Sequence, residues 1–289
     1  MGMTILVGAD GSAPAEEAAR LGAMLAGAGV VHLLHAVSVT PLGPLSALDT
    51  VSTVVSGSPG SLAEEWELSH EEEGIALLER ARRQVESAAA SAKVEVEQVQ
   101  GRPSDVILSR QSGFDLIALG SHGHGLLART FLGSVSMEVL QHAGRPVLFA
   151  RRAQLRTMLV GVDGSASCLR AAKMAGELAR DAGAELVFVH AAEVSLGRYG
   201  SNRERVKRAF EMAGQKAFDA AREAAGTAPA KALVVFDEAA HALVEGAKEA
   251  EADLVVVGRR GRTPAPQLGL GSVCRRVALH AQTSVLAVP

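Results

Sequence analysis

The chain has 289 residues and a formal net charge of −3 at pH 7. At about 150 residues per domain, this length predicts two domains, each large enough to bury a core of its own. The weak negative charge and the presence of only one Trp and one Tyr argue against a nucleic-acid-binding protein.

The chain opens with an apolar run that ends in an Asp-Gly-Ser turn, and the same run returns in the second half. Thr4-Ile-Leu-Val-Gly-Ala-Asp10 matches Thr157-Met-Leu-Val-Gly-Val-Asp163. Each run predicts a buried parallel strand. Asp10 and Asp163 allow two interpretations that can coexist: a turn residue that accepts from local backbone donors, and a carboxylate that binds a ligand.

A stretch without Asp, Glu, Lys or Arg lies between Arg20 and Asp49. Hydropathy alone would score part of it as a membrane span. The matching stretch of the second half carries Arg180 at the turn between helix and strand. We therefore expect a helix end followed by a buried strand ending at His35, as at His190 in the second half, and no membrane segment.

The segment Thr40–Gly60 makes the first half longer than the second. It is rich in Pro, Gly, Ser and Thr. A loop of this length in a compact domain is typical of a lid, a partner-docking loop or a mobile segment without function, and all three interpretations stay open. After it, capping boxes at Ser61-Leu-Ala-Glu64 and at Ser201-Asn-Arg-Glu204 predict the starts of two long helices.

The spacing Gly-x2-Gly-x9-Gly-Ser occurs once in each half. Its members are Gly120, Gly123, Gly133 and Ser134 in the first copy and Gly258, Gly261, Gly271 and Ser272 in the second. In both copies the first glycine follows an apolar run that predicts a strand, and the final Gly-Ser opens a predicted helix with the serine as its cap. Such a turn offers backbone N–H groups and the positive end of a helix dipole to an anion. The spacing predicts two phosphate or nucleotide sites, with an ordinary strand-helix turn as the alternative.

Several motifs of catalysis and metal binding are missing from the sequence. Neither loop has the lysine of a Walker loop, and the G-x-G-x-x-A match that starts at Gly123 lacks the acidic ribose partner of a dinucleotide site. His122 and His124 have no carboxylate nearby, so we expect no metal site there. Cys168 and Cys274 have no CxxC partner and are expected to be buried small residues in a reducing compartment.

The second loop departs from the first. Pro264 and Pro266 fix φ and remove two N–H donors, while Arg259, Arg260 and Arg262 add positive charge. The case for a site in the second half is therefore weaker than the case for one in the first.

The predicted elements alternate between strand and helix and close on a strand in each half. This order is typical of a mostly parallel sheet covered on both faces. We expect two α/β domains, residues 1–152 and 153–289, each an open five-stranded parallel sheet. Their final strands, Val147–Ala150 and Val285–Val288, are apolar and uncharged. Exposed sheet edges of this kind invite aggregation, and natural proteins charge, twist or cover them.

The residues of both halves resemble universal stress protein domains. The resemblance rests on Asp10 and Asp163, on the run Gly120–Ser134 with the helix that follows it, and on the closing Pro-Val-Leu; it covers nearly the whole chain, twice. The glycine spacing marks the ATP-binding subgroup of that family. The resemblance implies an adenine-nucleotide α-hydrolase-like fold with strand order 3-2-1-4-5 and a nucleotide between strands 1 and 4, in agreement with the general rule for open α/β sheets. It also implies that the two domains pair through their final strands, which would cover both edges.

The resemblance also implies a role for each candidate site residue. Asp10 and Asp163 would face adenosine, and the backbone of Ala36, Val37, Ala191 and Ala192 would meet the base. Ribose and phosphates would be held by Gly120, Gly123, Gly133 and Ser134 in the first half and by Gly258, Gly261, Gly271 and Ser272 in the second. Arg129 would reach a phosphate or remain a solvated surface side chain.

Three classes of function remain open. The leading one is a cytoplasmic stress-response protein that senses or regulates through bound ATP, alone or with Mg²⁺, without strong catalysis. The others are a slow nucleotide hydrolase of the same fold group and an interaction scaffold with empty loops. The expected partners are an adenine nucleotide, the other domain of the same chain and, as an open alternative, a second chain in a homodimer; neither nucleic acid nor a membrane is expected.

Overall fold

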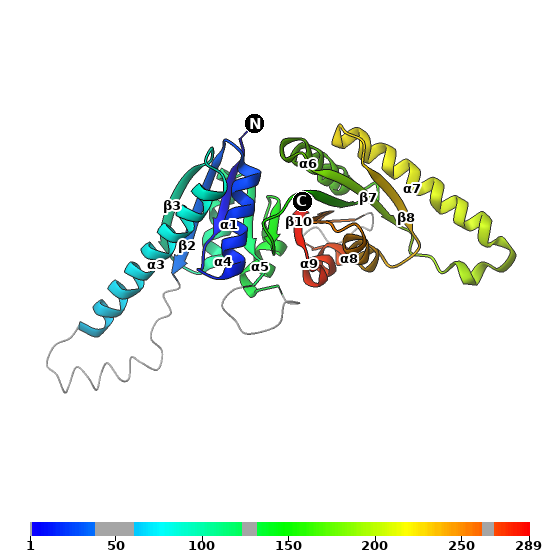
Figure 1. Ribbon diagram of the computed structural model, residues 1–289. Coiled ribbons are helices and arrows are strands. Elements are labelled where there is room, and N and C mark those ends of the chain that lie inside the picture. The colour runs from blue at the N-terminus through cyan, green and yellow to red at the C-terminus, as the bar shows by residue number, and fades with distance from the viewer. Residues whose placement is uncertain (1, 38–60, 123–131, 262–268) are drawn as a thin grey trace, which may run out of the picture.

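The computed structural model describes residues 2–37, 61–122, 132–261 and 269–289, and for residues 61–71 only the helical backbone. Strands and helices alternate in both halves (Figure 1). The first half contains β1 (Thr4–Gly8), α1 (Ala13–Ala26), β2 (Val30–Val37), α3 (Ser61–Ala88), β3 (Lys93–Gln100), α4 (Pro103–Arg110), the 3₁₀ turn η1 (Gln111–Gly113), β4 (Leu116–Gly120), α5 (Ser134–His142) and β5 (Val147–Ala150). The second half contains β6 (Thr157–Gly161), α6 (Ala166–Ala182), β7 (Glu185–Ala191), the 3₁₀ segment η2 (Leu196–Asn202), α7 (Arg203–Ala225), β8 (Lys231–Val235), α8 (Ala239–Glu249), β9 (Leu254–Gly258), α9 (Ser272–His280) and β10 (Ser284–Val288).

The strands of the described residues form one 10-stranded sheet, in the order β3-β2-β1-β4-β5-β10-β9-β6-β7-β8. Within each half all pairs are parallel. Numbered by half, the order is 3-2-1-4-5 on both sides, so the expected strand order is confirmed. The two sheets are continuous, because β5 and β10 pair antiparallel with Leu148 opposite Leu286.

Helices cover both faces of the sheet, and each face has its own hydrophobic core. Side chains alternate between the faces along a strand, so Leu6 belongs to one core and its neighbours Ile5 and Val7 to the other. The core that contains Leu6 packs under α4, α5, α8 and α9. The core that contains Ile5 and Val7 packs under α1, α3, α6 and α7. Both cores contain residues of both halves. The apolar strands β5 and β10 are buried along their whole length between them.

Three predicted element boundaries are wrong. β2 runs past His35 to Val37, and β7 runs past His190 to Ala191. The predicted capping box at Ser201 does not form, because this residue lies in η2 and α7 begins at Arg203 without a side-chain cap. A cap needs extended backbone, whereas the residue before α7 is already helical (φ −87°, ψ 0°).

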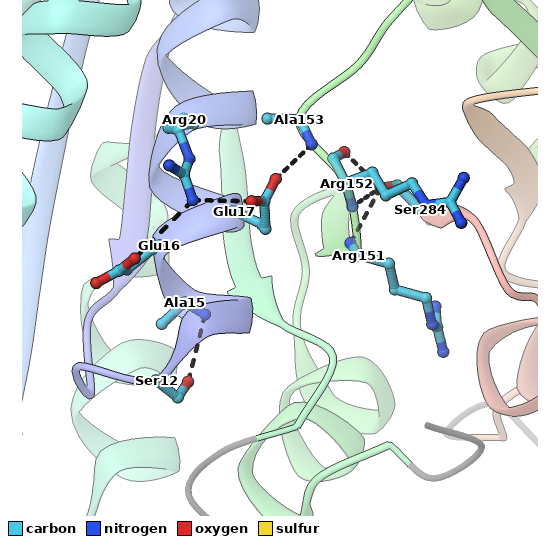
Figure 2. A network of polar contacts seen from close by, with 9 residues as sticks. All are labelled: Ser12, Ala15, Glu16, Glu17, Arg20, Arg151, Arg152, Ala153 and Ser284. Carbon is cyan, nitrogen blue, oxygen red and sulfur yellow. Dashed lines mark hydrogen bonds and ion pairs between the residues drawn. The ribbon is translucent and has the colours of Figure 1, made fainter. Parts of the chain in front are cut away.

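The connection between the halves is held from both sides (Figure 2). The backbone N–H of Ala153 donates to Glu17 Oε2 of α1 over 2.6 Å. The Ser284 hydroxyl of β10 accepts from the Arg151 N–H over 3.1 Å and donates to the Arg152 carbonyl over 3.1 Å. Ser284 is fully buried. The short connection is therefore tied to a helix of the first half and to a strand of the second.

Each half also sends a partly buried arginine to the other. The Arg151 guanidinium donates to the carbonyl of Ala278, in the last turn of α9, at 2.9 Å and to that of Thr283, directly before β10, at 3.2 Å. The Arg259 guanidinium donates to the carbonyl of Ala143, directly after α5. Burial lowers the pKa of Arg151 to about 10 and lowers the pKa of Arg259 as well. Helix C-termini carry partial negative charge, which offsets part of the cost of burying these cations.

Candidate nucleotide-binding site

A pocket of about 420 Å³ opens at the carboxyl ends of β1, β2 and β4 in the first half. It lies at the point where the strand order reverses between β1 and β4, the place where open α/β sheets bind their ligands. The first turns of α1, α4 and α5 complete its wall. Of the residues predicted for this site, the pocket brings together Asp10, Ala36, Gly120, Gly133 and Ser134.

Asp10 and Asp163 have the same local role in the two halves. Asp10 Oδ1 accepts from the backbone N–H of Ser12 at 2.9 Å and from its hydroxyl at 2.6 Å. Ser12 in turn caps α1. Asp163 Oδ1 accepts from the Ser165 N–H at 2.8 Å, and Ser165 caps α6. The turn interpretation of both aspartates is confirmed, and a second contact to a ligand stays a prediction.

The first glycine of each loop allows a helix to pack closely on the strand end. A Cβ on Gly120 would lie 2.8 Å from the backbone nitrogen of Ala15 in α1. A Cβ on Gly258 would lie 2.8 Å from the backbone nitrogen of Cys168 in α6. Both distances are far inside van der Waals contact. These glycines are thus required for the packing of strand and helix, as is one glycine of a dinucleotide fingerprint.

The last glycine and serine of each loop differ from the prediction. The N-cap of α5 is Gly133, with extended backbone (φ −62°, ψ 159°), and Ser134 is the first helical residue. Gly271 and Ser272 have the same places at α9. The serine is therefore not the cap, and no side chain caps either helix. The loops close at their base, because Gly133 N donates to Ser121 O at 2.9 Å and Gly271 N to Arg259 O at 2.9 Å.

This arrangement leaves the N-terminus of α5 suited to an anion. The first N–H groups of a helix have no intrahelical acceptor, and the positive end of the dipole lies at the same place. Ser134, Val135 and Ser136, whose N–H groups these are, all line the pocket. The helix therefore presents donors and positive potential to the cavity.

Ser136 was not singled out by the sequence analysis. Its hydroxyl donates to the Gly120 carbonyl at 2.9 Å and so ties the first turn of α5 to the end of β4. It is 6% exposed. A comparison of the two copies carries the only signal for it, because Cys274 replaces it at the same position of α9.

The end of β2 forms the opposite wall. Leu34 and Ala36 line the pocket. Val37 is the last residue of the strand, and its carbonyl already accepts from the Gly101 N–H at 2.9 Å. His35 Nδ1 donates to the Ala9 carbonyl at 2.7 Å, so this histidine holds two strand ends together.

The corresponding residues of the second half follow the same plan. His190 is buried and its Nδ1 donates to the Val162 carbonyl at 2.7 Å. Ala191 ends β7, and the Ala192 N–H donates to Val235 O at 2.8 Å. Both halves therefore use a histidine near the end of the second strand to bind the chain that follows the first strand.

Part of the first loop lies outside the described residues. Gly123 and Arg129, both predicted to contact phosphate, are among these, as is His124. His122 does line the pocket, with its Nδ1 2.9 Å from the Ser121 hydroxyl. The insertion Thr40–Gly60 also lies outside the described residues.

In the second half, the described start of the loop lies against the turn that follows β6. A Cβ on Gly261 would lie 3.2 Å from Asp163 Oδ2. Arg260 accepts from the Ser165 hydroxyl through its carbonyl, and its N–H faces the Ser167 hydroxyl, both at 3.4 Å. The Arg259 guanidinium contacts the first half, while its backbone carbonyl closes the base of its own loop. One of the three arginines predicted to add positive charge to this loop thus places its charge against the first half. Pro264 and Pro266 lie outside the described residues.

Two features are absent from the part of the chain that the structure describes. No three His, Cys, Asp or Glu side chains of the described residues gather closely enough to hold a metal ion. None of the helices in this part of the chain has the length and apolar composition that crossing a membrane requires.

Comparisons with known proteins agree with this geometry. A sequence model of the universal stress protein family matches residues 1–151 and again residues 154–289. Two universal stress proteins of Mycobacterium tuberculosis are similar along their length: one is 31% identical over 290 residues, covering 96% of this chain and 93% of that protein, and the other is 30% identical over 294 residues, covering 98% and 95%.

A solved structure shows the same fold. The crystal structure of a universal stress protein from Archaeoglobus fulgidus covers 99% of this chain and 97% of its own, with a TM-score of 0.66 at 19% identity. With two family matches that together span nearly every residue, and with relatives of the same length, this chain belongs to the universal stress protein family and carries two of its domains.

Proposed function

We propose that the first half binds an adenine nucleotide, with ATP as the ligand, in the pocket at the ends of β1, β2 and β4. The observation that carries the proposal is the N-terminus of α5, which has no side-chain cap and whose first three residues line the pocket. Backbone N–H groups and the helix dipole at such a position favour a phosphate group.

The remainder of the pocket suits an adenosine group. Leu34, Ile107 and Leu132 form an apolar wall of buried side chains against which a base can pack. Asp10 provides a carboxylate at the rim, the group that a ribose hydroxyl can donate to. The volume lies within the range of roughly 300–1,000 Å³ that is usual for small-molecule sites. A Mg²⁺ ion would be held chiefly by the phosphates of ATP.

The proposed role of the bound nucleotide is regulatory or sensing, in a chain of two domains, residues 1–152 and 153–289. Among the described residues that line the pocket, the titratable ones are Asp10 and His122. Asp10 is engaged in its turn, and His122 lies beside Ser121. The serine hydroxyls next to them, those of Ser12 and Ser121, are only 5% and 1% exposed, so neither residue activates an accessible nucleophile. The described wall also has no lysine for the terminal phosphates.

The proposal is tested by denaturing the purified protein and analysing the released small molecules by chromatography, followed by titration of nucleotide-free protein with ATP. Release of an adenine nucleotide, or saturable ATP binding, is the expected result. Failure of both would favour the scaffold alternative. Sustained turnover of about one per second or more would instead favour the hydrolase.

A further inference from the structure

One ion pair joins the two helices that flank the pocket. Arg102, the N-cap residue of α4, donates to Glu138 of α5 over 2.7 Å. Pro103 of α4 and Ser134 of α5, each close in sequence to one partner of this pair, line the pocket. The pair therefore lies next to the candidate nucleotide site, although neither Arg102 nor Glu138 lines the pocket itself.

The second half has the same ion pair with the charges exchanged. Glu238 is the N-cap residue of α8, and it pairs with Arg276 of α9 over 2.9 Å. Glu138 and Arg276 occupy the same position along α5 and α9. The fold thus accepts either polarity of the pair, and packing does not explain why the first half places its positive charge on the α4 side.

The charged groups around the ion pair also differ between the two halves. In the second half, carboxylates accept from four consecutive backbone N–H groups at the start of α8. Asp237 accepts from Glu238 at 2.7 Å, Glu193 from Ala239 at 2.9 Å, and Glu238 from residues 240 and 241 at 3.0 and 3.3 Å. In the first half, Arg102 makes no such cap. In the first half Arg102 therefore lies beside Glu138 and Asp105, whereas the second half gathers three carboxylates beside Arg276 and His241.

We infer that Arg102 is a specificity-determining residue of the first site, which selects ligands that carry phosphate groups, and that Glu238 in its place makes the second site unfavourable for them. This inference rests on the proposed nucleotide site. The Arg102 side chain is 64% exposed and its pair with Glu138 is solvated, so it can exchange that carboxylate for a phosphate at little cost. A guanidinium binds phosphate oxygens through two parallel hydrogen bonds.

The different charges near the two sites lead us to expect different ligand binding by the two halves. A polyphosphate approaching the second site would meet Glu238 where the first site has Arg102, with Glu193 and Asp237 beside it and Arg276 as the positive partner. The larger share of like charge opposes binding. The two halves are therefore inequivalent, and the first takes the nucleotide with the greater number of phosphates.

The test is to exchange the pair in the first half, as Arg102→Glu with Glu138→Arg, and to titrate parent and variant with ATP and with adenosine by calorimetry. The exchange copies the arrangement that the second half already carries, so the thermal unfolding midpoint should stay that of the parent. ATP affinity is expected to fall about tenfold or more, and adenosine affinity to change less than about twofold.

Glu138→Gln is the matched control, because it breaks the same ion pair but leaves Arg102 in place. It should hold or raise ATP affinity, whereas Arg102→Gln should lower it. ATP affinity that is unchanged in the exchanged variant, or lowered equally by both glutamine variants, would overturn the inference while leaving the nucleotide site intact. A parent protein that binds neither ATP nor adenosine would remove the proposed function and the inference with it.

Discussion

Cys168 and Cys274 occupy the positions in the second half that Ala15 and Ser136 hold beside the first pocket. Both thiols are buried, and burial raises the pKa of Cys168 to about 11 and that of Cys274 to about 12. At neutral pH they are therefore protonated. Where Ser136 ties α5 to the end of β4 through a hydroxyl, a thiol is a much weaker donor.

We predict that neither thiol reacts with a disulfide reagent such as dithionitrobenzoate in the native protein. Since only the thiolate is nucleophilic, modification at pH 8 should follow the rate of global unfolding. The folded pKa values lie above the unfolded value of roughly 8.5, so both thiols support the fold below that pH and lose this contribution as the pH rises toward 11. Rapid modification of either cysteine under native conditions would contradict this assignment.

For individual residues, the sequence predicts which ones belong to the site better than it predicts their contacts. Spacing groups Gly120, Gly133 and Ser134, and the family resemblance adds Asp10; the structure places all four at one pocket. Spacing cannot tell which residue of Gly-Ser is the helix cap, because backbone conformation decides this, and Gly133 adopts the extended conformation. Ser136 escaped notice because its acceptor, the Gly120 carbonyl, is distant in sequence.

Among the helices and strands, the packing contact between the end of β4 and the start of α1 positions the site. α1 starts beside Asp10, and its first turn passes so close to Gly120 that no side chain fits between them. The same contact joins β9 and α6 at Gly258. The strand end and the helix start thus behave as one unit that carries two walls of the pocket.

We predict that Gly120→Ala destabilises the protein by about 1–3 kcal/mol, because the added methyl group would overlap the backbone of α1. The free energy of unfolding in urea measures this loss. Gly113→Ala is the control, since a Cβ there has no atom within 4 Å and stability should hardly change. Equal unfolding midpoints for the two variants would show that α1 can move away from β4 without cost.

Sequence patterns predict the elements well where the apolar runs are short and uninterrupted. They predict β1, β4, β6 and β9 at nearly their observed bounds. They miss the last residues of β2 and β7, whose extent depends on pairing with β3 and β8. The predicted start of α7 is wrong as well. The segment η2 leads directly into the helix, and this tertiary preference overrides the capping signal of Ser201.

At the scale of the whole molecule, two five-stranded sheets share both of their cores. β5 and β10 would each be an exposed apolar edge in a separate domain, and each covers the other here. Further hydrogen bonds join the halves around this strand pair. Glu17 and Ser284 bind the connection, and the guanidinium groups of Arg151 and Arg259 each reach from one half to the other. The strand order follows from family resemblance, since local patterns do not encode how distant strands pair.

We predict that Leu148→Glu disrupts the joint, because it puts an unpaired charge at a fully buried position opposite Leu286. A cost of several kcal/mol, roughly 3 or more, is expected from the loss of hydration. Leu148→Met keeps the volume and should cost less than about 1.5 kcal/mol. Thermal unfolding and sedimentation measure both variants together with the fragment 1–152, which should self-associate through its bare β5 edge. A monomeric fragment and a Leu148→Glu variant with parental stability would show that the halves join elsewhere.

The central claim is that the N-terminus of α5 binds the phosphates of a nucleotide, and its most direct test is the calorimetric affinity for ATP of Ser134→Asp against Ser134→Asn. Ser134 is exposed at the first position of α5, where a carboxylate favours the helix and would itself occupy the positive end of the dipole. The account predicts that the aspartate variant is as stable as the parent and binds ATP about tenfold or more weakly, while the asparagine variant stays close to the parent. ATP affinity that is equal in the two variants and in the parent would contradict it.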